Sequence, residues 1–93
     1  MARDLETDLN ILRTILSHAE NRDFQRAAAL AQQTLASGFE HPLLYNVIAT
    51  QLEIDGKYAD ALRLLERAVN ISPADVGARN ALSLCLQRLE RQS

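Results

Sequence analysis

The sequence predicts an all-α fold in which five helices form antiparallel pairs. Apolar residues recur at intervals of three and four, as at Tyr45, Ile48, Ala49 and Leu52, which places them along one stripe of a helix. After the turn-like segment "DGKY" a second stripe of the same kind follows. Nothing alternates with period two over a useful length, so we expect no sheet.

The first two expected helices span about 4–20 and 24–37. The first carries an apolar stripe at Leu12, Ile15, Leu16 and Ala19, and the second contains the run "AAALA". Gly38 follows the second helix, where a residue that can take the left-handed conformation caps the C-terminus. This part of the chain therefore predicts a helical hairpin.

The remaining helices are expected at about 42–54, 58–71 and 75–91. Pro42 can begin the third helix, because the first helical position does not need an amide hydrogen. Gly56 can turn the chain between the third and fourth helices. Pro73 ends the fourth helix, and Asp75 can cap the fifth.

The two hairpins resemble each other in sequence. The segments "RDFQRAAAL" and "GKYADALRL" match at an offset of 34 residues. The helices that precede them match better at an offset of 33, which sets Leu12 on Tyr45 and Leu16 on Ala49. Such a period is typical of helical repeat proteins. We therefore expect the turn of the first hairpin to be one residue shorter than that of the second.

The middle of the chain resembles the tetratricopeptide repeat, a helix pair of about 34 residues. The residues that carry the resemblance are Tyr45, Ile48, Ala49, Leu52, Gly56, Tyr58, Ala61, Leu65, Ala68 and Pro73. It implies a right-handed α-solenoid of antiparallel helix pairs, forming a single domain over residues 1–93. Repeat one would span about 8–41, repeat two 42–75, and a partial third repeat or capping helix 76–93.

Composition and charge exclude several classes of partner. Twelve acidic and ten basic residues give a formal charge of −2 without a block of like charge, so we expect no nucleic-acid partner. The longest apolar runs fall far short of the ~20 residues of a membrane span, and the N-terminus lacks a signal-peptide pattern. The single cysteine excludes an internal disulfide and suits the reducing cytoplasm. Cys85 lies in an apolar stripe and is expected to be a small buried residue.

The sequence contains no motif that indicates catalysis. His18 and His41 are the only histidines and lie 23 positions apart, and neither belongs to a metal-binding or nucleophile motif. None of the three glycines lies in a phosphate-binding loop. We therefore expect no enzymatic activity, no cofactor and no metal.

The resemblance implies that the first helix of each pair lines a concave groove, which would bind a peptide or helix of a partner protein. The candidate groove residues are Arg13, Ser17, Asn46, Val47, Thr50, Asn80, Leu84 and Arg88. Asn can hydrogen-bond an extended peptide backbone, and Arg can pair with a carboxylate. The alternative is that these residues are merely solvated. Val47 and Ala81 stand where the family's Asn clamp for acidic C-termini would be expected, so we do not expect that activity.

Two other functions stay open. The C-terminal helix could expose Ala81, Leu84 and Cys85 as a patch for homo-oligomerisation. The alanine-rich repeats also resemble bacterial ones that precede catalytic domains. The chain could thus be the N-terminal recruiting or oligomerisation domain of a longer enzyme, such as a sulfotransferase-, hydroxylase- or glycosyltransferase-type protein, cut after residue 93.

Overall fold

The computed structural model describes residues 4–92, and this part of the chain forms five helices and no strand. The helices are α1 (Leu5–Glu20), α2 (Phe24–Ala36), α3 (Pro42–Ile54), α4 (Tyr58–Ile71) and α5 (Val76–Gln92). The predicted all-α class is confirmed, and each predicted helix end lies within one residue of the observed one.

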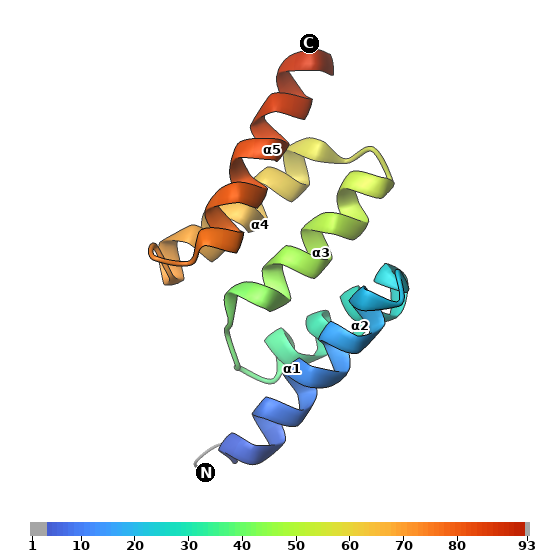
Figure 1. Ribbon diagram of the computed structural model, residues 1–93, viewed down its shortest axis with the longest axis vertical. Coiled ribbons are helices and arrows are strands. Elements are labelled where there is room, and N and C mark those ends of the chain that lie inside the picture. The colour runs from blue at the N-terminus through green and yellow to red at the C-terminus, as the bar shows by residue number, and fades with distance from the viewer. Residues whose placement is uncertain (1–3, 93) are drawn as a thin grey trace.

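The helices are arranged in two layers along an elongated molecule of 45 × 26 × 20 Å. Each helix packs against its neighbours in the chain, and α3 also contacts both α1 and α5. In Figure 1, α1 crosses in front of α2 and α5 in front of α4, with α3 between the two ends. One layer therefore contains α1, α3 and α5, and the other contains α2 and α4.

Side chains cap most of the helix N-termini. Asp4, Asp23 and Asp75 each accept a hydrogen bond from a backbone amide of the first turn, at 3.0, 3.2 and 3.0 Å. His41 caps α3 in the same way, because its Nδ1 accepts a hydrogen bond from the backbone amide of Leu43 at 3.1 Å. Pro42 occupies the first turn of α3. The predicted roles of Pro42 and Asp75 are thus confirmed, whereas the capping role of His41 was not foreseen.

The turns within the two helix pairs are the same. Each is three residues long, over residues 21–23 and 55–57. In both, the second and third residues donate amide hydrogen bonds to carbonyls three and five residues back, at 3.0 and 2.8 Å. The middle residues, Arg22 and Gly56, both have positive φ, at 60° and 78°. The two turns therefore match at an offset of 34 residues.

The prediction of a shorter first turn is consequently wrong. It rested on matching Leu16 with the buried Ala49, but Leu16 is 45% exposed. Ile15 takes the buried position instead and is 0% exposed, as Ala49 is. The sequence match aligned large apolar side chains, whereas the packing of α1 turns the residue one position earlier toward the core.

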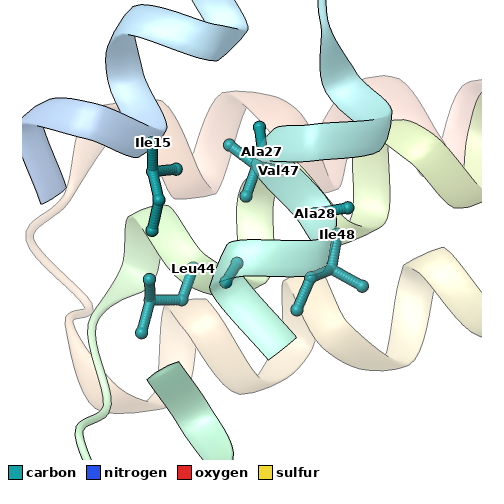
Figure 2. Close-up of a cluster of buried hydrophobic side chains, with 7 residues drawn as sticks. Ile15, Ala27, Ala28, Leu44, Val47 and Ile48 are labelled. Atoms are coloured by element: carbon teal, nitrogen blue, oxygen red, sulfur yellow. The ribbon is translucent and has the colours of Figure 1, made fainter. Parts of the chain in front are cut away.

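The core consists of small and large side chains from facing helices. Its largest cluster joins α1, α2 and α3 (Figure 2) and contains Ile15, Ala27, Ala28, Ala31, Leu44, Val47 and Ile48. Ala49, Ala61, Leu65 and Cys85 form a second cluster where α3, α4 and α5 meet. A third cluster contains Tyr45, Ala68 and Ala78. Each helix pair is therefore held to the next by buried apolar contacts.

A polar network links α4 to the segment 37–41, which connects α2 to α3. Tyr45 Oη and Arg67 Nη2 both donate to Glu40 Oε1, each at 2.8 Å. The hydrogen bond from Arg67, aided by that from Tyr45, lowers the pKa of the Glu40 carboxyl below its ordinary value of 4.5. The folded chain therefore stabilises the charged form of Glu40.

We predict that this network makes stability depend on pH. Because the folded pKa of Glu40 is lowered, its stabilisation is fully present above the ordinary value of 4.5 and is lost as the pH falls through the folded pKa. Glu40→Gln should therefore lower the urea midpoint of unfolding more at pH 7 than at pH 3. Glu66→Gln, a change at an exposed glutamate of α4, should show no such pH-dependent difference. Equal effects of Glu40→Gln at both pH values would contradict the prediction.

We further predict opposite effects of substitution at the two turn residues. A left-handed conformation costs a residue with a Cβ roughly 1–2 kcal/mol relative to glycine. A Cβ added at Gly56 meets no atom within 4 Å, so Gly56→Ala should lower the free energy of unfolding by about 1 kcal/mol through backbone strain alone. Arg22→Gly should raise it, by up to about 1 kcal/mol. Urea unfolding followed by circular dichroism measures both, and a destabilised Arg22→Gly would show that the arginine side chain supports the fold.

Candidate functional site

A cavity of about 620 Å³ lies between α3 and α5. From α3 it is lined by Thr50, Glu53 and Ile54, from α5 by Ala81, Leu84 and Arg88, and from the two helix-pair turns and their flanks by Arg22, Phe24 and Tyr58. Residues more than 60 positions apart in the sequence thus share one wall. The small side chain of Ala81 leaves room between the two helices.

Two large apolar side chains of this cavity are open to solvent. Ile54 is 61% exposed at the end of α3, and Leu84 is 50% exposed on the facing side of α5. Removing apolar surface from water is favourable by roughly 25 cal/mol per Å². A ligand that covered both side chains would therefore gain affinity from apolar contact.

Two residues of the cavity wall form an ion pair. Arg88 of α5 donates a hydrogen bond to the Glu53 carboxylate of α3. The Glu53 side chain is only 12% exposed, whereas that of Arg88 is 48% exposed. Glu53 raises the pKa of Arg88, through the hydrogen bond and its charge. The pair joins α3 to α5 and leaves Glu53 with a matched charge.

Cys85 does not line this cavity. The residue is 0% exposed, and its thiol donates to the backbone carbonyl of Tyr58 at 3.5 Å. Burial, together with the negative charge of Glu53, raises the pKa of the thiol. The expected buried position of Cys85 is confirmed. For the same reason Cys85 contributes nothing to an exposed patch on α5, contrary to the self-association hypothesis as stated above.

The structure brings three of the sequence-predicted groove residues together. Thr50, Leu84 and Arg88 all line the cavity. Asn80 is exposed on α5 but is not among the residues of the cavity wall.

The predicted residues in the middle of α3 are buried in part or in full. Val47 is 5% exposed and packs in the core between α2 and α3 (Figure 2). It therefore contributes to the packing of α3. Asn46 is half-buried, and among the described residues nothing hydrogen-bonds its buried Oδ1 atom.

The predicted residues of α1 lie away from the cavity. Arg13 and Ser17 are exposed and do not line it. The observed offset of 34 pairs Arg13 with the buried Val47, and it pairs Leu16 with Thr50. An alignment at an offset of 34 would have selected other residues on α1.

Sequence reasoning missed Ile54, Glu53 and Arg22. A signal for Ile54 was present, because an offset of 34 places it at the position of the candidate Arg88. A signal for Arg22 was also present, since it stands where the second turn has Gly56. Neither signal showed that these residues meet in one cavity, which depends on how the turn at 21–23 lies against the end of α3.

A second cavity, of about 510 Å³, lies on the other layer. Its wall consists of Gln32 and Leu35 of α2, Ile48 and Leu52 of α3, and Asp60, Arg63 and Leu64 of α4. Ile48 is only 6% exposed, and the three leucines are half-buried. Its exposed lining is at least as apolar as that of the first cavity, but it contains no large apolar side chain as exposed as Ile54 or Leu84.

The described residues provide no other indication of a site. Within residues 4–92, no group of three or more His, Cys, Asp or Glu side chains could hold a metal ion. None of the helices in that range is long and apolar enough to span a bilayer. Comparisons with family models, with curated proteins and with solved structures find no match.

Proposed function

We propose that the chain is a tetratricopeptide-type interaction module without catalytic activity, which binds an apolar peptide or helix of a partner protein between α3 and α5. The observation that carries the proposal is the pair of exposed side chains, Ile54 of α3 and Leu84 of α5, that line one cavity. The identical turns at an offset of 34 support the assignment to a helical repeat. In such an array, α1, α3 and α5 would line the concave side.

The cavity has room for one large side chain of a bound segment. Small-molecule sites usually measure about 300–1,000 Å³ and combine an apolar surface with a few polar groups. Here Ile54 and Leu84 supply the apolar surface, and Thr50 and Arg88 stand beside them. A partner helix or peptide that inserted one large apolar side chain would cover both exposed residues. Such buried anchors commonly supply most of the binding energy.

The chemistry of Glu53, Cys85 and His41 also favours binding over catalysis. Glu53 is already paired with Arg88, and burial raises the pKa of Cys85, which keeps its thiol protonated at neutral pH. His41 accepts a hydrogen bond at the start of α3. These groups therefore fill structural roles. We also propose that the protein is bacterial and cytoplasmic, because a free, buried cysteine suits a reducing compartment.

Homo-oligomerisation through α5 is the second candidate. Val76 and Leu86 are 67% and 44% exposed on this helix, which favours it. However, the residues of α5 at an offset of 34 from Tyr45 and Ala49 are Arg79 and Ser83, both exposed. α5 thus has no buried residues that correspond to the large Tyr45 and the small Ala49 of α3. A recruiting role within a longer enzyme would use the same cavity.

We predict that two exposed leucines of α5 differ in their effect on binding. The native chain is used to select 12-residue peptides from a random library displayed on phage. Leu84→Glu should lower the affinity for the selected peptides by about tenfold or more, because it places a carboxylate against the apolar ligand. Leu86→Glu, a matched change at an exposed leucine outside the cavity, should leave affinity within about twofold.

The outcomes separate the two candidates. Circular dichroism should show unchanged helicity in both variants. If no peptide is enriched over an uncoated surface, or if both variants bind as the native chain does, the cavity is not the binding site. If light scattering shows a native dimer that Leu86→Glu dissociates while peptide selection fails, oligomerisation through α5 is the better account.

A further inference from the structure

Arg22 occupies a backbone conformation that favours glycine. Its φ is 60°, and the other described residues with positive φ are Gly38 and Gly56, at 99° and 78°. The hydrogen bonds of its turn match those around Gly56, so the backbone has the same requirement in both places. Nothing in the turn itself favours arginine. Non-glycine residues held in this region often have a functional role.

Arg22 lines the cavity, and its side chain has no partner among the described residues. It makes no hydrogen bond or ion pair with any residue from 4 to 92. In contrast, Arg26 pairs with Asp23 at 3.3 Å, and Arg88 pairs with Glu53 across the cavity. Arg22 therefore brings an unpaired guanidinium to the cavity wall.

The charges of the cavity favour an anionic ligand group. Its wall contains two cations, Arg22 and Arg88, and one anion, Glu53, so its formal charge is +1, although the whole chain carries −2. Because Arg88 and Glu53 neutralise each other, the remaining positive charge belongs to Arg22. The same wall holds the exposed Ile54 and Leu84.

We infer that Arg22 recognises a side-chain carboxylate of the bound segment. The partner is thus a protein segment that carries Asp or Glu close to the large aliphatic residue that packs on Ile54 and Leu84. Guanidinium and carboxylate form a planar, two-fold hydrogen-bonded pair, which gives both affinity and orientation. This inference rests on the proposed function and specifies its ligand.

The test repeats the peptide selection on three forms of the full chain. Library peptides are fused through their C-termini, so only side chains supply carboxylates. The native chain and Arg79→Ala, which removes an exposed arginine outside the cavity, should enrich peptides that combine an acidic with an aliphatic residue. Arg22→Gly, which suits the turn conformation, should enrich aliphatic peptides without the acidic preference.

A synthetic, C-terminally amidated peptide from the native selection then allows a double-mutant cycle. Its affinity should fall by about tenfold or more on Arg22→Gly, and less on Arg22→Lys, which keeps the charge but not the planar fork. Replacing its acidic residue with the amide should weaken binding to the native chain equally, with no further loss on Arg22→Gly. Arg22→Gly should remain at least as thermally stable as the native chain, so unfolding would not explain the loss.

Each other outcome counts against a specific statement. Enrichment of peptides without an acidic preference on the native chain, or an additive cycle, overturns the role of Arg22 and leaves the proposed function in place. Binding that needs a free C-terminal carboxylate overturns the side-chain source. Failure to enrich any peptide overturns both the inference and the proposed function.

Discussion

Close approach of the helices at buried alanines is the constraint on which the rest of the structure depends. Six alanines, at positions 27, 31, 49, 61, 68 and 78, are 0% exposed. Helix axes can approach to about 8 Å only where such small side chains lie at the crossing. Larger residues such as Leu65 and Cys85 then fill the space beside each crossing. With two tyrosines, two phenylalanines and no tryptophan, the chain has little aromatic volume with which to fill a looser core.

The same packing determines where apolar surface stays uncovered. Ala49 and Cys85 are fully buried in one cluster, which holds the middle of α3 against α5, and Arg88 with Glu53 ties the helices further along. Beyond this contact, α3 ends at Ile54 and the chain turns away at Gly56. Because Ala81 is small, no side chain of α5 fills the space that remains. The cavity is therefore a direct result of the way in which α3 and α5 are joined.

The sequence predicted the helices well because their ends depend on local chemistry. Pro42, Gly56 and Asp75 act through their own backbone or through an amide three residues away. The position of α1 depends on tertiary packing, and there the prediction placed Leu16 inside although Ile15 is the buried residue. For the site, the resemblance suggested Thr50, Leu84 and Arg88 from their helix faces. Ile54 has the same repeat position as Arg88 and was overlooked. Arg22 could not be found from a helix face, since it reaches the cavity only through the contact of a turn with another helix pair.

Two features of the cavity bring the free chain no gain in stability. A polar residue at position 54 or 84 would avoid exposing a large apolar side chain, and glycine at position 22 would avoid a strained backbone. The hairpin at 55–57 shows that the fold accommodates glycine in that turn. Local departures from what a fold favours are expected at functional sites. Here an exposed apolar pair and a left-handed arginine, which have independent physical origins, line the same cavity. Their coincidence is explained if both contact the same bound segment, the exposed pair through apolar burial and the arginine through its charge.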